Sequence, residues 1–403
     1  MLLLTAEEYA APDEQPQLRE RWFRVPQETD DRKYAEHVRF ILKTMRKEPA
    51  HTLSYNIFTT TDCNARCFYC FEMGRSRVSM SEETAHRAAA YIAAHCGSRP
   101  VKLGWFGGEP LFNRTVIDTI CTELTRRGVD YRSTMMSNGY LFDDETVRRA
   151  AALWKLRRVQ ITLDGTEAVY NRCKAYVYRG GQSPYRIVLA NIGRLLEAGI
   201  LVVIRLNMDK HNAEDLTMLV DELHERFAGE NGLRVYSHLL FEFAGSEPRI
   251  RSDEDRRRLC AAQDRLSQRL EQYGMDTKHR LRRELPLNQC MADSGSALTI
   301  LPGGELGLCD HYSENNFAGT IDGEGLDAEV VRRFRECRED IPECAGCVIY
   351  PECVRLKQCP SSERCYPETR EQTRRKILHA MLNTYDAWHS EQDAEEENDP
   401  EPC

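Results

Sequence analysis

The chain has 403 residues, of which 41% are hydrophobic and 30% charged, so it is long enough for two domains and is not a wholly disordered protein. Its formal net charge of -9 argues against a nucleic-acid partner held mainly by phosphate contacts. No stretch approaches the roughly 20 apolar residues of a membrane span and no basic leader precedes Glu7, so we expect a cytoplasmic protein with no membrane partner.

Residues 1–50 are polar and charged, and we expect an N-terminal appendage with one helix over residues 32–47. Residues 51–248 alternate apolar strands with amphipathic helices. A capping box of Ser79 and Glu82 predicts where the first of these helices begins. The strands are expected at residues 54–59, 101–106, 131–136, 159–163, 201–206 and 235–243, and the helices at residues 82–95, 114–127, 144–155, 184–198 and 213–228.

Six strand–helix units in this order predict an α/β fold, a partial (β/α)6 barrel of TIM type. In such barrels the chemistry lies at the C-terminal ends of the strands. Residues 249–284 are rich in arginine, and we expect a solvated helical linker, with a surface for an acidic leader peptide as the alternative. A helix over residues 371–390 and an acidic, disordered tail over residues 391–403 are expected to end the chain.

Residues 285–370 are rich in cysteine, glycine and proline, which predicts a small domain organised around metal. The chain has 16 cysteines in all, and cytosolic thiols are kept reduced, so clustered cysteines are more often metal ligands than disulfides. Two clusters stand out, one near residue 65 and one in this C-terminal domain.

The first cluster is Cys63, Cys67 and Cys70, which directly follow the first expected strand. Three thiolates on one tight loop can hold three irons of a 4Fe-4S cluster and leave the fourth iron open to a small molecule with an amine and a carboxylate. The alternative is a zinc knuckle with a fourth ligand from elsewhere, although zinc sites favour paired C-x-x-C groups.

This spacing after a strand resembles the signature of the radical S-adenosylmethionine (SAM) superfamily, with Tyr69 at its aromatic position. The resemblance implies a 4Fe-4S cluster and bound SAM. Further segments at strand ends resemble the family's SAM-binding motifs. They comprise Gly107, Gly108, Glu109 and Pro110 toward the amino group, Ser137 and Asn138 toward the ribose and carboxylate, and Asp164, Arg205 and Asn207 on the next two strands. The arginine could equally cap a strand or pair with a surface acid.

Seven C-terminal cysteines are too many for one site, and their order resembles the SPASM extension of radical SAM enzymes that modify peptides and proteins. That resemblance implies two auxiliary 4Fe-4S clusters, three in all. It assigns Cys290, Cys309 and Cys359 to the first auxiliary cluster, and Cys344, Cys347, Cys353 and Cys365 to the second. The spacing around Cys359 and Cys365 departs from the family pattern, so which of these two serves which cluster stays open. A zinc ribbon is the alternative for the C-x-x-C pair.

Asp310 directly follows Cys309, as an aspartate does in the sulfatase maturases of this family, and the resemblance makes it the candidate general base. A purely structural aspartate that binds loop amides is the alternative. The family implies a peptide maturase that abstracts a hydrogen from a ribosomally made precursor peptide and installs a thioether or another side-chain crosslink. Flavodoxin or ferredoxin would supply single electrons. The alternatives are a formylglycine-generating anaerobic sulfatase maturase and a zinc-stabilised peptide-binding protein.

Overall fold

The computed structural model describes residues 10–11, 15–20, 28–45, 50–70, 72, 76–177, 181–240, 252–276, 287–288, 290–311, 316–359, 365 and 367–396. The expected strand residues 241–243, helix residues 46–47 and tail residues 397–403 lie outside these ranges.

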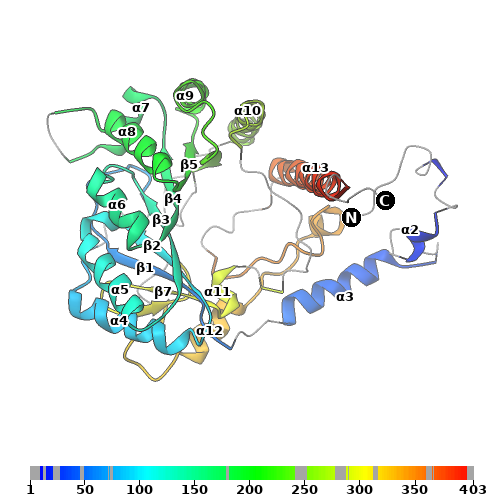
Figure 1. Cartoon of the computed structure of the whole chain (residues 1–403). Coiled ribbons are helices and arrows are strands. Elements are labelled where there is room, and N and C mark those ends of the chain that lie inside the picture. Colours follow the sequence, from blue (N-terminus) through cyan, green and yellow to red (C-terminus); the bar gives the residue numbers. More distant parts are fainter. Residues whose placement is uncertain are drawn as a thin grey trace, which may run out of the picture.

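Six parallel strands form the core of the fold, and Figure 1 shows them curving around one side of the molecule. Their order is β6-β5-β4-β3-β2-β1, so each strand lies beside its neighbour in sequence, as repeated right-handed strand–helix units require. The strands are β1 Ser54–Thr60, β2 Val101–Gly107, β3 Tyr131–Ser137, β4 Leu156–Leu163, β5 Leu201–Met208 and β6 Leu233–Leu239. The other edge of β1 is paired with a later strand, so the barrel is partial, as the sequence predicted.

Helices pack on the outer face of this sheet (Figure 1). They are α4 Glu82–His95, α5 Arg114–Arg126, α6 Asp144–Ala152, α7 Glu167–Lys174, α8 Pro184–Glu197 and α9 Ala213–Arg226. Helix α4 buries Ala85, Ala88, Ala89 and Ile92, the i, i+3, i+4, i+7 stripe of an amphipathic helix. Helix α7, which the sequence analysis did not predict, is short and carries no such stripe: its buried residues are Tyr170 and Lys174.

The predicted cap of α4 was wrong. The helix is capped by Ser81, whose hydroxyl accepts from the Thr84 backbone N–H at 3.0 Å. Ser79 instead lies 2.9 Å from the Thr60 hydroxyl, in an isolated bridge to the end of β1. Both serines fit a helix start in sequence, but Ser79 is needed to fix the chain against the strand.

The C-terminal region continues the barrel sheet. Strand β7 (Ala297–Ile300) pairs with β1 in parallel, and β8 (Glu305–Gly307) and β9 (Phe317–Thr320) follow as antiparallel strands. Around them lie the short helices α11 (Met291–Ser294) and α12 (Ala328–Arg335) and the 3-10 turn η4 (Pro342–Gly346). The cysteine-bearing segments are therefore joined to the barrel through its β1 edge.

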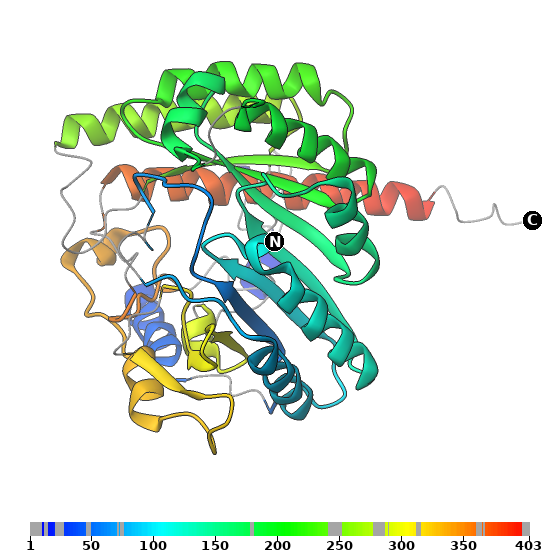
Figure 2. The same ribbon diagram turned by 90° about the vertical axis from the view of Figure 1, so that its left-hand side faces the viewer.

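Besides the short α2 (Pro16–Glu20) and the 3-10 turn η2 (Pro110–Asn113), three further helices complete the described elements: α3 (Asp31–Thr44), α10 (Asp253–Gln272) and α13 (Pro367–Glu396). Helix α10 buries Leu259, Leu266 and Leu270, so it is a packed element and not the expected solvated linker. Figure 2 shows α13 running beside α10, where Gln372 Nε2 donates to the Cys260 carbonyl at 3.3 Å.

Helix α13 extends further than predicted. It includes Glu395 and Glu396, which were expected in a disordered tail, because glutamate is a good helix former and continues a helix that packing has started. Among the described residues, no helix is both long enough and apolar enough to cross a membrane.

Candidate functional site

A cavity of about 610 Å³ lies at the C-terminal ends of the barrel strands. Its wall includes residues from every barrel strand or from the loop that follows it, together with Asp310 from the C-terminal region. The sequence-predicted residues that line it are Cys63, Cys67, Tyr69, Cys70, Gly107, Gly108, Ser137, Asn138, Arg205, Asn207 and Asp310. A cavity of this size falls in the usual range of small-molecule sites.

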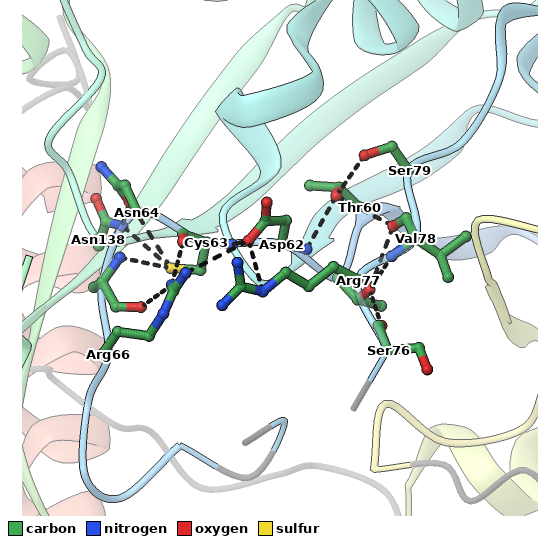
Figure 3. A network of polar contacts seen from close by, with 12 residues as sticks. Thr60, Asp62, Cys63, Asn64, Arg66, Ser76, Arg77, Val78, Ser79 and Asn138 are labelled. Atoms are coloured by element: carbon green, nitrogen blue, oxygen red, sulfur yellow. Dashed lines mark hydrogen bonds and ion pairs between the residues drawn. The ribbon is translucent and has the colours of Figure 1, made fainter. Parts of the chain in front are cut away.

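The loop that carries Cys63, Cys67 and Cys70 is fixed by backbone and side-chain bonds. Figure 3 shows Asn138 donating to Asn64 Oδ1 at 2.7 Å, with the Cys63 sulfur 3.8 Å from the same nitrogen. Within the loop, Arg66 donates to the Cys63 carbonyl. The end of β3 thereby holds the cysteine loop over the cavity.

Burial shapes the chemistry of these thiols. Burial, and then the negative charge of Glu109, raise the pKa of Cys63 to about 12. Burial also raises the pKa of Cys70, while the positive charge of Lys174 opposes that rise. A cluster that binds these sulfurs must displace their protons, and its cationic irons supply the charge that makes this favourable.

The glycine motif packs closely against the cysteine loop. Gly107 has φ of 118°, and a Cβ there would lie 2.1 Å from the Thr60 carbonyl oxygen, so no other residue fits. The backbone N–H groups of Gly108 and Glu109 donate to the carbonyls of Thr60 and Asp62 at 3.0 and 2.9 Å. The motif thus fixes where the chain leaves β1 and enters the cysteine loop.

Glu109 and Pro110 are buried and are not among the residues that line the cavity. Glu109 is fully buried, and its carboxylate accepts from the Ser137 hydroxyl at 2.9 Å and from the Asn138 N–H at 2.8 Å. Burial raises its pKa to about 7, although these two bonds oppose the rise. The structure therefore joins the two predicted motifs in one network, with Ser137 and Asn138 between the carboxylate and the cavity.

Asn207 offers a polar group to the cavity. It is 5% exposed, and its Oδ1 has no hydrogen-bond partner in the described part of the chain. A buried oxygen without a partner costs free energy, so a ligand that donates a hydrogen bond there would recover that loss. Arg205 lines the same wall two residues earlier, as alternation along β5 dictates.

Asp164 does not line the cavity. It is 1% exposed and accepts from the Tyr69 hydroxyl at 2.7 Å, and the Lys174 Nζ lies 3.1 Å from its Oδ2. Lys174 does line the cavity. Lys174 was not among the predicted site residues, because α7 was not predicted and nothing in the sequence placed this lysine at the strand ends.

The wall also contains Gln160 and Thr162, which the sequence analysis did not select. Polar residues at alternate positions near the end of an apolar strand were the available signal.

Asp310 is held by the pairing of two strands. Asn56 on β1 and Thr299 on β7 are register partners, and both donate to Asp310 Oδ1, at 2.5 and 3.3 Å. The carboxylate is thereby placed in the same cavity as the three cysteines of the first loop.

Cys290, Cys309 and Cys359 come together in the C-terminal region. Burial raises the pKa of Cys290 and raises that of Cys309 to about 12, and the charge of Cys359 adds to both shifts. Cys359 is therefore close enough to both thiols for its charge to act on them.

Cys344 and Cys353 lie together at a second place, beside Arg39 of α3. Arg39 is 6% exposed and donates to the carbonyls of Pro351, at 3.0 Å, and Cys353. It also pairs with Asp340, whose hydrogen bond and negative charge raise the pKa of Arg39 against the opposing effect of burial; the charges of Cys353 and Cys344 add to that rise. Helix α3 of the expected N-terminal appendage is therefore anchored on the segment that carries Cys353.

Cys347 follows Cys344 in this segment, with its N–H 3.2 Å from the Cys344 carbonyl, and Cys365 is half-buried. Within the described part of the chain, no three Cys, His, Asp or Glu side chains are grouped closely enough to hold a single metal ion.

Residues 57–223 match the family model of the radical SAM superfamily. Fe-coproporphyrin III synthase of Methanosarcina barkeri (strain Fusaro / DSM 804) is 25% identical over 213 residues, which cover 50% of this chain and 50% of that protein. The match thus spans about half the length of that curated relative.

Solved structures share the fold over most of the chain. anSMEcpe with bound AdoMet and Cp18Cys peptide has a TM-score of 0.60 at 13% identity, covering 82% of this chain and 96% of that one. Streptococcus suis SuiB bound to S-adenosylmethionine has a TM-score of 0.57 at 14% identity, covering 89% and 87%. SuiB bound to precursor peptide SuiA has a TM-score of 0.56 at 12% identity, covering 89% of each chain. These likenesses confirm the predicted fold class.

The residues present fit the two groups that such a domain binds. Three thiols on one loop leave room for one open iron, and the glycine backbone, the Asn207 oxygen and the strand-end polar groups surround the adjoining cavity.

Proposed function

Because residues 57–223 match the radical SAM family model, we propose that this protein is a peptide maturase that oxidises a ribosomally made precursor peptide and installs a thioether or another side-chain crosslink. The observation that carries the proposal is that Cys63, Cys67 and Cys70 line one cavity together with Asp310. Cofactor loop and candidate base would then face the same substrate.

Within this proposal, Cys63, Cys67 and Cys70 hold the first 4Fe-4S cluster, and Gly107, Ser137 and Asn207 hold SAM beside it. When bound, this pair supplies a 5′-deoxyadenosyl radical that abstracts hydrogen. Phe106, Met136 and Leu240 give the cavity an apolar wall, which excludes water from the reacting carbon.

Asp310 takes the proton that the substrate releases when it is oxidised. Its Oδ1 is held by Asn56 and Thr299, which aim the carboxyl group into the cavity. Cys290, Cys309 and Cys359 hold the first auxiliary cluster directly beside it, and Cys344, Cys347, Cys353 and Cys365 hold the second. Flavodoxin or ferredoxin supplies electrons singly.

A peptide substrate is supported by the fold alone. SuiB bound to its precursor peptide SuiA, and anSMEcpe bound to a peptide, both share the fold over more than four-fifths of this chain. The domain limits that go with this proposal are 51–248 for the barrel and 285–370 for the auxiliary-cluster domain.

A second candidate is a sulfatase maturase that converts a cysteine or serine of its target to formylglycine. The placement of Asp310 in the cavity favours this candidate as well, because either oxidation needs a base at the substrate.

The test is an anaerobic reaction of the reconstituted protein with SAM, dithionite and each of two substrates. One is a cysteine-rich precursor peptide encoded beside the gene, and the other is a peptide containing a sulfatase target sequence. The proposal predicts loss of two hydrogen masses from the precursor peptide together with a new linkage between two of its residues in tandem mass spectrometry. Formylglycine in the sulfatase peptide, with the precursor peptide unmodified, would favour the second candidate.

A further inference from the structure

A buried ion pair between Lys174 and Asp164 contacts the cysteine loop through the Tyr69 hydroxyl. Lys174 ends α7 and is 3% exposed; its Nζ lies 3.1 Å from Asp164 Oδ2 and 2.8 Å from the Tyr69 hydroxyl. The Tyr69 hydroxyl in turn donates to Asp164 at 2.7 Å. Since Tyr69 stands between Cys67 and Cys70 in the chain, this trio reaches directly into the loop.

The backbone strengthens the same connection. The Arg66 N–H donates to the Lys174 carbonyl at 2.8 Å, and the Val177 N–H donates to the Asn64 carbonyl at 2.9 Å. The end of α7 and the cysteine loop are thus fixed together by two backbone bonds as well as by the Tyr69 side chain. Ala175, which directly follows the helix, turns the chain with φ of 44°.

The two charges differ in their distance from the cavity. Lys174 lines the cavity together with all three cysteines, whereas Asp164 does not line it. The positive member of the pair is therefore the one that faces the cysteines.

Buried ion pairs contribute little net stability, because the cost of removing both charges from water offsets their attraction. A fully apolar pair would support the loop at least as well. The presence of a lysine at this position is therefore better explained by what its charge does to a neighbouring group.

We propose that Lys174, held by Asp164 and Tyr69, is a positioning residue for the first cluster whose buried charge stabilises that cluster's reduced form. The inference rests on the proposed function. Adding an electron makes the cluster more negative, and a nearby ammonium in a low-dielectric site favours the more negative state. The lysine thus makes the cluster easier to reduce.

The test is a redox titration of the holoenzyme, poised with dithionite and followed by electron paramagnetic resonance on the signal that changes when SAM is added. Lys174→Met removes the charge and keeps the length of the side chain. At a fixed potential we expect a ratio of reduced to oxidised cluster about tenfold lower than in wild type, which corresponds to about 59 mV for one electron.

Two further variants complete the design. Lys174→Met combined with Asp164→Asn leaves no buried charge unpaired and so protects folding; we expect its ratio to fall between those of wild type and Lys174→Met. Lys155→Met removes one positive charge beside the opposite end of β4 and should leave the ratio unchanged.

A double variant that titrates like wild type would overturn the inference, and so would a Lys174→Met variant that is reduced as easily as wild type. If wild type gives no SAM-sensitive signal at all, it is the proposed function that fails.

Discussion

Asn56 on β1 donates a 2.5 Å hydrogen bond to Asp310, a residue 254 positions later in the chain. The bond is possible because β7 pairs with β1 and brings the C-terminal region to the open edge of the barrel. The carboxylate then faces the cavity that the first cysteine loop also lines.

This placement predicts that Asp310→Ala retains reductive cleavage of SAM but loses modified product. A general base contributes on the order of 100-fold or more, so product formation should fall at least that far. The measurement is parallel quantitation of 5′-deoxyadenosine and modified peptide. Thr299→Val, which removes only the 3.3 Å donor, is the matched control and should have a much smaller effect. Unchanged product from Asp310→Ala would leave the aspartate a structural role only.

The contacts of Arg39 indicate a role for helix α3 in cluster assembly. Arg39→Gln removes a nearly buried cation that donates to the carbonyls of Pro351 and Cys353, and it leaves Asp340 with Lys43 as its remaining ion-pair partner. We expect the protein to lose one auxiliary cluster, about four iron atoms per chain, while SAM cleavage persists.

The measurement is iron and acid-labile sulfide per chain after anaerobic reconstitution. Arg32→Ala breaks an exposed pair with Glu36 on the same helix and should keep the full iron content, because such pairs are worth little. Full iron in Arg39→Gln would contradict the prediction.

We expect the free energy of unfolding to depend on pH through Glu109. Its pKa is raised to about 7 by burial, against about 4.3 in an unfolded chain. Between these values the folded state keeps a proton that the unfolded state has lost, so this contribution to stability is complete below about pH 4.3 and is lost as the pH rises through 7.

The whole loss is about 4 kcal/mol relative to a residue that does not titrate, and about 2 kcal/mol of it falls above pH 5.5. Urea unfolding of wild type and Glu109→Gln at pH 5.5, 6.5 and 8 would measure it. The wild-type midpoint should fall relative to that of the variant as the pH rises. Two midpoints that stay parallel across this range would show that Glu109 does not titrate there.

We expect replacement of Asn207 to lower the affinity for SAM without loss of the cluster. Removing the unpartnered buried oxygen in Asn207→Ala should weaken binding by about tenfold, the worth of one hydrogen bond of roughly 1 to 1.5 kcal/mol. Anaerobic equilibrium dialysis with labelled SAM would measure this. The control is Asn113→Ala, which removes a side-chain amide that donates to the Thr59 and Met80 carbonyls and does not line the cavity. This variant should leave the affinity unchanged. Equal affinities in wild type and Asn207→Ala would remove Asn207 from the site.

The sequence was sufficient for the barrel because its strands are apolar and its helices carry regular stripes. The buried stripe of α4 and the burial of Ile57, Leu103 and Val159 in their strands follow directly from periodicity. The cysteine loop was also predictable, because three ligands close together in sequence must be close in space.

Long-range pairing was not predictable. Nothing in the sequence shows that β7 adds to β1, that Arg39 packs on a segment some 300 residues later, or that Lys174 reaches Tyr69. Asp164 illustrates the limit: its position at the end of β4 was predicted, but its side chain turns to a buried lysine and not to the cavity. Side-chain direction at a strand end depends on the neighbours that tertiary packing brings.

The most direct test of the central claim is anaerobic quantitation of 5′-deoxyadenosine from SAM and dithionite, comparing wild type with the variant in which Cys63, Cys67 and Cys70 are all replaced by Ala. We expect wild type to form the nucleoside and the triple variant to form none, while the auxiliary-cluster absorbance of the variant near 400 nm persists. Undiminished formation in the triple variant would contradict that claim.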